Sequence, residues 1–314
     1  VDGAGEAGRR RELSARALAR IRHTRILSAG ALETYGDCPV KWLVERELRP
    51  RPLAPEPDPL VRGNVMHALL ERLLRELDAP LTPATVDRAL SLLDGLLAEL
   101  GASGPQALAA GAPDAVRRAV LRSIEAGLRR YLEYAARTGS GWSAYGLEVA
   151  FGFEDEGSLP ALELGDGPER VLLRGRIDRI DTDGHGHAVV VDYKSGASRA
   201  TWPAARWSAD RRLQVAIYLL VVRELAGLDP VAGVYQPLRG EDLRARGVFL
   251  KGSAACAGLS RTDGRSAEEI GSLLDDAAER AVALARALRA GELTPCPRTC
   301  SHEGCAHPTI CRSQ

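Results

Sequence analysis

The sequence predicts an α/β protein in which a central mixed sheet is flanked by helices and preceded by a helical region. Two observations lead to this prediction. Apolar residues in the first half recur at spacings of three and four, as on one face of a helix. The middle of the chain instead carries short runs rich in valine and isoleucine, separated by turn residues, which is typical of strands.

The first half is expected to be mostly helical. Residues 9–25 predict a basic helix, and Ser28 is a suitable N-cap for a short helix that reaches Tyr35. Another helix follows Pro39, and the proline-rich segment 49–59 is a connector that cannot be helical throughout. Three longer helices come next, over residues 61–77, from Thr82-Pro83 to about Leu100, and 114–137.

The second half predicts strands first and helices later. The segment TDGHG between residues 181 and 187 has the chemistry of a hairpin turn, so the strands on either side of it should pair. Two further helices are expected at 210–225 and 266–290. The expected strands cover residues 146–153, 170–181, 187–196, 231–238 and 247–252.

A chain of 314 residues fits one elaborated domain or two small ones, and we expect one. Its expected segments are an N-terminal helical extension (1–27), a first connecting segment with Cys38 (28–58), a helical region (59–140), a core that contains the sheet (141–255), and a C-terminal helix with a cysteine-rich tail (256–314). The chain starts at Val1 and its one methionine is Met66, so we expect a segment of a larger polypeptide.

Composition narrows the class of protein. The 42 basic and 42 acidic residues balance, so net charge gives no sign of a nucleic-acid partner but leaves room for a local basic channel. No stretch approaches the ~20 apolar residues of a membrane span, and the polar, arginine-rich start is unlike a signal peptide, so we expect a cytoplasmic protein without a membrane partner. Only Lys41, Lys194 and Lys251 are lysines, which makes each lysine a stronger functional hint than usual.

The most informative pattern is GRIDRID followed by VVVDYKSG. Residues two apart on a strand point to one side, so Asp192 and Lys194 share a face, and the hairpin can bring Asp178 beside Asp192. Two carboxylates at one end of a sheet repel each other unless a divalent cation neutralises them, and a nearby lysine can then activate water. The alternative is a surface hairpin with a cross-strand ion pair. The VVV run favours a buried strand, where ionised residues need a purpose.

These residues resemble the PD-(D/E)XK nuclease superfamily, and most closely its RecB/AddB-type nuclease domain with an iron–sulfur staple. The resemblance implies a restriction-endonuclease-like core, with Asp178 and Asp192–Tyr193–Lys194 as the motif. It implies that Mg²⁺ or Mn²⁺ is held by the family's metal-linked histidine and by carboxylates, here His67, Asp178, Asp192 and, least securely, Glu148. The catalytic set that it implies is Asp178, Asp192, Lys194, and the Q-x-x-x-Y residues Gln214 and Tyr218.

Each of these positions also has a structural interpretation. Alone, His67 reads as a core or helix-surface histidine, and an acidic residue such as Glu148 is common beside strands. Gln214 and Tyr218 are one helical turn apart and suit either an amphipathic helix or a grip on a DNA strand. Two tryptophans in the arginine-rich loop near residues 202–207 fit base stacking and core anchoring about equally.

The cysteines predict a metal site that joins the chain ends. Three clustered thiolates and one distant thiolate can complete a [4Fe–4S] cluster. The resemblance implies the ligands Cys38, Cys300, Cys305 and Cys311, although the family's usual C-x2-C-x5-C spacing is not kept. Cys296 is therefore the alternative to Cys300, and a four-thiolate zinc site is the alternative to the cluster.

The expected function is a metal-dependent DNA nuclease, an exonuclease that processes broken DNA ends in recombination repair. No G-x-x-x-x-G-K-[ST] motif occurs, so the motor for unwinding would be a helicase domain or subunit elsewhere. Its substrate would be DNA, single-stranded or at unwound ends. The alternatives are a Cas4-like standalone nuclease and a catalytically silent DNA-binding scaffold.

Overall fold

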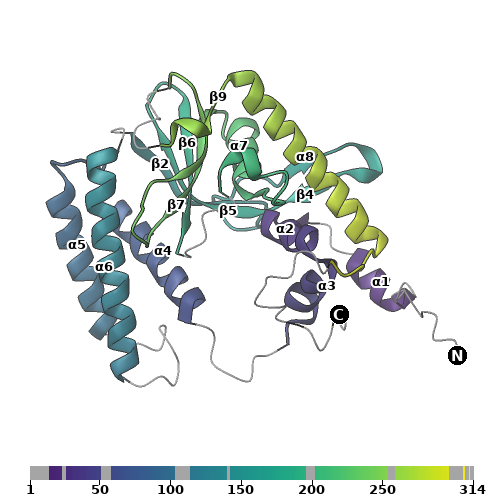
Figure 1. Ribbon diagram of the computed structural model, residues 1–314, viewed down its shortest axis with the longest axis horizontal. Helices are drawn as coiled ribbons and strands as arrows, with labels where there is room; N and C mark the ends of the chain where they lie inside the picture. Colours follow the sequence, from purple (N-terminus) through teal and green to yellow (C-terminus); the bar gives the residue numbers. More distant parts are fainter. Residues whose placement is uncertain are drawn as a thin grey trace, which may run out of the picture.

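The computed structural model describes residues 14–22, 26–50, 58–102, 114–139, 142–195, 202–253, 259–296, 307 and 311. Within these ranges, helices cover both faces of a six-stranded sheet, so the architecture is the predicted mixed sheet flanked by helices (Figure 1). The predicted cluster ligands Cys300 and Cys305, and both ends of the helix predicted at 9–25, lie outside the described residues.

Helices dominate the N-terminal half and return after the sheet. They are α1 (Ala15–Arg22), α2 (Ala29–Asp37), α3 (Pro39–Trp42), α4 (Asp58–Leu77), α5 (Val86–Ala102), α6 (Asp114–Thr138), α7 (Gln214–Glu224) and α8 (Ala267–Ala290), with a π-helical turn η1 (Leu43–Leu48) and 3-10 turns η3 (Gly167–Glu169), η4 (Ala204–Arg206) and η6 (Arg261–Asp263). The predicted N-cap is confirmed, because Ser28 Oγ accepts a hydrogen bond from the Ala31 N–H. In the described residues, no helix is long and apolar enough to cross a membrane.

The strands form two sheets. They are β1 (Ile26–Leu27), β2 (Ser143–Phe151), β3 (Leu162–Leu164), β4 (Val171–Leu173), β5 (Gly175–Thr182), β6 (His187–Lys194), β7 (Asp229–Pro237), β8 (Arg246–Leu250) and β9 (Gly264–Arg265). The large sheet has the order β2-β5-β6-β7-β8-β9, with parallel pairing at β6–β7 and β8–β9 and antiparallel pairing elsewhere. The small sheet has the order β1-β4-β3.

The core lies on both faces of the large sheet, as alternation along β6 shows. Ala188 and Val190 pack in the cluster with α2, α7 and α8, whereas Val191 and Tyr193 pack in the cluster with α4, α5 and α6. Neighbouring strand residues point to opposite faces, so a strand covered on both faces is apolar at nearly every position. In the VVV run of β6, Val190 and Val191 are buried and Val189 is half-buried, so the strand is largely covered, as the sequence predicted.

Several elements differ from the prediction. The strand predicted at 170–181 is two strands, because the chain leaves the small sheet at Arg174, whose N–H donates to the Leu27 carbonyl, and then enters the large sheet. The strand β3 was not predicted, since three residues are too few to show alternation. Helix α5 starts at Val86, because Thr85 Oγ1 accepts from the Thr82 N–H in a separate turn.

The two loop tryptophans anchor the loop in the core. Trp202 and Trp207 are 5% and 2% exposed, and the Trp207 indole N–H donates to the Trp202 carbonyl at 2.7 Å. Both rings lie 6.0 Å from the Tyr235 ring. Buried rings offer no face to DNA bases, so of the two interpretations the structure supports core anchoring.

Candidate active site

Strands β5 and β6 separate at the aspartate motif. The register of β5 and β6 ends where Arg179 lies opposite Val191. One residue further, an Asp178 carboxylate oxygen accepts a hydrogen bond from the backbone N–H of Tyr193 at 2.6 Å. The Asp178 side chain thus takes the place of the next backbone hydrogen bond between β5 and β6. It holds the two strands together at the point where they diverge.

Asp192 and Lys194 form a pair on one side of β6. The Asp192 side chain is 2% exposed and is ion-paired through Oδ2 with Lys194 Nζ, whose side chain is 30% exposed. The same ammonium donates to Gln214 Oε1 at 3.0 Å and lies 5.3 Å from the centre of the Tyr235 ring. These contacts fix the position of the Lys194 ammonium, which still reaches solvent. A group that acts on a substrate needs to be accessible in this way.

Helix α7 brings Gln214 and Tyr218 to this pair. The Gln214 amide donates to the Tyr218 hydroxyl at 3.0 Å, so the side chains one helical turn apart form one chain of hydrogen bonds with Lys194. The helix lies very close to β7, because a Cβ added at Gly233 would stand 2.7 Å from a Val215 methyl group. The glycine therefore sets how near α7 comes to the sheet.

The N-terminus of α7 is capped from a distant part of the chain. Leu213, its N-cap residue, makes no side-chain cap. Instead Glu33 Oε1, on α2, accepts hydrogen bonds from the N–H groups of Leu213 and Gln214 at 2.6 and 2.9 Å. Glu33 Oε2 lies 3.5 Å from Arg212 Nη1. This contact was not predicted, because no local pattern marks a cap 180 residues away from its helix.

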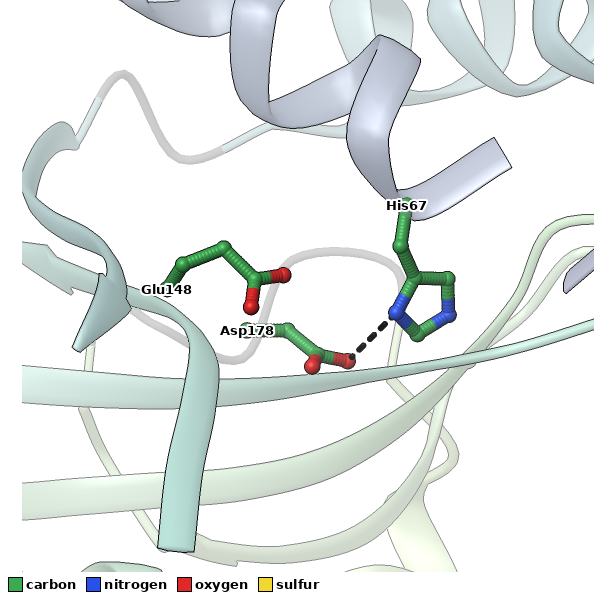
Figure 2. Close-up of side chains that lie close together, drawn as sticks. All are labelled: His67, Glu148 and Asp178. Carbon is green, nitrogen blue, oxygen red and sulfur yellow. Dashed lines mark ion pairs between the residues drawn. The ribbon is translucent and has the colours of Figure 1, made fainter. Parts of the chain in front are cut away.

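Helix α4 carries His67 to the strand ends. A Cβ added at Gly63, one turn earlier, would stand 2.7 Å from Ser195 Oγ, so the helix can lie against the end of β6. His67 Nδ1 is 3.6 Å from Asp178 Oδ2, and the nearest ligand atoms of His67, Glu148 and Asp178 all lie within 4.8 Å of one another. Figure 2 shows the three side chains converging.

Glu148 reaches the group from β2 through an unusual backbone. Its φ of +51° is in the left-handed region, which costs about 1–3 kcal/mol for a residue other than glycine. Burial and the charges of Asp178 and Glu71 raise the pKa of Glu148 to about 7, although His67 and Arg176 act in the opposite direction. The left-handed backbone and the raised pKa of Glu148 both have an energetic cost. The surrounding structure must therefore hold this carboxylate in place.

Electrostatics around the aspartates fits a cation site. Burial raises the pKa of Asp192 to about 6, against the effect of Lys194 and with the effect of Asp178. Burial lowers the pKa of His67, but the contact with Asp178 at 3.6 Å and the charges of Asp192 and Glu148 raise it by more, so the net direction is upward.

The donor set suits a hard divalent cation. Carboxylate oxygens with one imidazole nitrogen are ligands that Mg²⁺ or Mn²⁺ can use, and no thiolate is among them. The structure groups His67, Glu148 and Asp178, whereas Asp192, the other predicted ligand, is turned to Lys194. The residues present therefore fit such a cation, with Asp192 at the edge of the group.

The described cysteines lie in the two segments that the sequence predicts to be joined. Cys38 is buried and follows α2, and Cys296 and Cys311 belong to the C-terminal tail. Tyr35 donates to the Glu292 carbonyl at 2.6 Å, and His307 Nε2 lies 3.2 Å from Glu45 Oε1. These two contacts hold the segment after α8 against the N-terminal segment that carries Cys38.

A buried polar network behind the motif was also not predicted. The Tyr193 ring packs edge-on against His67 and Tyr131, and the Tyr131 hydroxyl lies 3.4 Å from that of Tyr193. On the same side, Arg179 Nε donates to Asp181 Oδ1 at 2.5 Å. A tyrosine between Asp192 and Lys194 was the only local signal for this network.

An α/β core in which two neighbouring strands fork around aspartates, with a lysine and a histidine beside them, defines the class of protein as a restriction-endonuclease-like nuclease fold. Comparison with known proteins gives the family. The chain belongs to the PD-(D/E)XK nuclease superfamily, whose family model matches residues 26–312.

Curated relatives are named as a subunit of an ATP-dependent helicase/deoxyribonuclease. The protein from Symbiobacterium thermophilum is 31% identical over 218 residues, which are 63% of this chain and 18% of the relative. The one from Clostridium acetobutylicum is 40% identical over 89 residues, 27% of this chain and 7% of the relative. A Clostridium perfringens relative is 24% identical over 211 residues, 62% of this chain and 17% of the relative. The chain thus matches less than a fifth of the length of each of these three relatives.

Proposed function

We propose that this chain is a metal-dependent deoxyribonuclease domain, an exonuclease on single-stranded or unwound DNA ends. The observation that carries the proposal is the fork of β5 and β6, which places Asp178, Asp192 and Lys194 together beside His67. The alternative, a surface hairpin with a simple ion pair, does not fit a buried β6 strand. Ionised groups on a buried strand need compensation from their surroundings.

Mg²⁺ or Mn²⁺ is the proposed cofactor, held by His67, Asp178 and Glu148, with Asp192 as a further ligand. When bound, such a cation polarises a phosphoryl oxygen and lowers the pKa of water. In support, burial and the charge of Asp178 raise the pKa of both Glu148 and Asp192, as expected for carboxylates that crowd around a cation site.

The chain's own residues supply positioning and charge. Lys194 orients the attacking water, and its ammonium stabilises negative charge that develops on the phosphate. Asp192 and Gln214 fix the direction of that ammonium. Tyr218 fixes Gln214 in turn, and these two side chains orient the DNA strand.

A structural [4Fe–4S] cluster is proposed for the joined ends, held by Cys38, Cys300, Cys305 and Cys311, with Cys296 in place of Cys300 as the alternative. The contacts of Tyr35 and His307 support it, because they bring the two segments together. Four thiolates also suit zinc, so metal content decides between the two.

The proposed setting is DNA break processing and recombination repair in the bacterial cytoplasm, with a helicase domain or subunit that unwinds the DNA. The support is the name of the relatives, which joins helicase and deoxyribonuclease. The chain itself contains no P-loop motif.

The test is digestion of end-labelled linear and closed circular single-stranded DNA with Mg²⁺, Mn²⁺ or EDTA. Protein is purified without oxygen, and its iron, sulfide and zinc contents are measured. We expect cleavage of the linear DNA only, abolished by EDTA and by Asp192→Ala. The matched control is Asp275→Ala, which removes an exposed carboxylate on α8 and should leave cleavage unchanged.

Three results would each contradict a part of the proposal. Cleavage that persists in EDTA would exclude a divalent cation from the reaction. No cleavage by the intact protein, with its cluster in place and a helicase partner added, would leave a DNA-binding scaffold. Cleavage of the circle would replace the exonuclease with an endonuclease.

A further inference from the structure

We infer that Glu33 is a positioning residue for Lys194, through the N-terminus of α7 and Gln214. The inference rests on the proposed function, in which Lys194 acts on the substrate. It adds a residue on α2, in a segment outside the strand fork, to the groups on which the site depends.

The first step is the contact itself. A helix leaves its first N–H groups without partners inside the helix, and a side-chain oxygen at the N-cap usually accepts from them. Leu213 has no such oxygen, and Glu33 Oε1 accepts from the N–H groups of Leu213 and Gln214 instead. A carboxylate at this end also interacts favourably with the helix dipole.

The second step is how firmly Glu33 is held. Its side chain is 12% exposed, and its other oxygen faces the Arg212 guanidinium at 3.5 Å. It sits in the middle of α2, whose C-cap is Cys38. The carboxylate therefore joins the cysteine-bearing segment to α7.

The third step leads from the cap to Lys194. Gln214 is the first residue of α7. Its side chain is attached to the backbone that Glu33 holds, so the side chain moves when the start of the helix moves. That side chain accepts from Lys194 Nζ at 3.0 Å and donates to Tyr218 at 3.0 Å. Movement of the helix start would change the direction of the lysine ammonium, whereas none of His67, Glu148 and Asp178 lies on α7.

The test compares Glu33→Ala and Glu33→Gln with Glu47→Ala, a control on η1 in the same N-terminal segment. We expect Glu33→Ala to lower kcat about 10- to 100-fold, as misplacement of a reacting group does, with Mn²⁺ affinity within about twofold of wild type. Glu33→Gln should recover much of kcat, because its amide oxygen can accept the same two hydrogen bonds. Glu47→Ala should leave kcat unchanged.

A double-mutant cycle separates positioning from general support of the fold. If Glu33 acts through Gln214, Glu33→Ala should lower kcat no further in a Gln214→Ala protein, since residues on one path are not additive. Equal losses in both backgrounds would overturn the inference. So would a folded Glu33→Ala protein with wild-type kcat.

One readout does not need nuclease activity. The chain has three lysines, so protein labelled with [¹³C]lysine gives one set of side-chain signals each for Lys41, Lys194 and Lys251. Glu33→Ala should shift the Lys194 signal and speed amide exchange at Leu213 and Gln214, while Lys251 stays unchanged. An unshifted Lys194 signal would overturn the inference. If wild-type protein cleaves no DNA, the proposed function fails, and the signal still decides whether Glu33 positions Lys194.

Discussion

Strand β5 carries the same tripeptide twice, and its two aspartates have opposite surroundings. Arg176-Ile177-Asp178 and Arg179-Ile180-Asp181 follow one another directly. The second aspartate is ion-paired with Arg179 at 2.5 Å, and both side chains are at most 14% exposed. The first instead faces His67 and Glu148, at the point where the strands part.

The difference shows how a structural carboxylate can be told from a functional one. Burial raises the pKa of Asp181, but Asp181 has its own partner, Arg179, which lowers it. At the other position, burial and the charge of Asp178 raise the pKa of both Glu148 and Asp192, so a divalent cation from outside can stabilise this group. The same substitution at the two positions can therefore test the comparison directly.

The largest effect is expected for Asp178→Asn. It removes a proposed metal ligand and weakens the acceptor for the Tyr193 N–H, so kcat should fall about 10³-fold, or ~4 kcal/mol of transition-state stabilisation. Single-turnover cleavage of linear DNA measures the loss, and a Mn²⁺ titration should show weakened binding. Cleavage within tenfold of wild type would remove Asp178 from the site.

Asp181→Asn should give the reverse result. It leaves Arg179 buried without its partner, which typically destabilises a protein by about 3–5 kcal/mol. Denaturant unfolding measures the loss, while kcat per folded molecule should stay within about threefold of wild type. A loss of kcat as large as that of Asp178→Asn, in folded protein, would break the comparison.

A smaller effect is expected on thermal stability when the pH is raised or a divalent metal ion is added. The pKa values of Glu148 and Asp192, about 7 and 6, lie above the ordinary values of 4.5 and 3.8. Their contribution to stability is therefore complete below the ordinary values and is lost as pH rises through about 6 to 7, so the Tm of metal-free protein should fall over this range. Mn²⁺ at about 100 times its Kd should restore ~2.7 kcal/mol at pH near 8.

Thermal unfolding with Mn²⁺ or EDTA, near pH 5 and near pH 8, measures that effect. The gain from Mn²⁺ should be larger near pH 8, because the carboxylates must lose protons to bind the ion. Asp178→Asn is the matched control and should show little gain. Equal Tm values with Mn²⁺ and EDTA near pH 8 would argue against the metal site.

The sequence predicted the parts of the site that lie on one strand or one helix. The fixed periods of strand and helix place Asp192 with Lys194, and Gln214 with Tyr218, and the structure shows both pairs in contact. The histidine-bearing helix and the mixed sheet were likewise readable from local patterns. The catalytic and metal-binding roles of these residues stay predictions until the variants are measured.

What the sequence did not reveal depends on packing between distant segments. The left-handed backbone of Glu148 and the cap by Glu33 have no local signature, because each is imposed by neighbours far away in the chain. The split of the predicted strand at Arg174 has the same origin, since the chain changes its partner sheet there. Periodicity reports which face is buried, and it says nothing about which segment covers it.

The cap by Glu33 also has a consequence for the order of events during synthesis. A ribosome adds about 5–20 residues per second, so Glu33 precedes its partners, 180 residues later, by roughly 9 to 36 seconds. During that interval the growing chain gains His67 and, only near its end, Asp178 and Asp192, while the helix that directs Lys194 is still missing. Under the roles proposed above, a nascent chain would reach its full rate of DNA cleavage only after α7 has been made, long after the first proposed metal ligand.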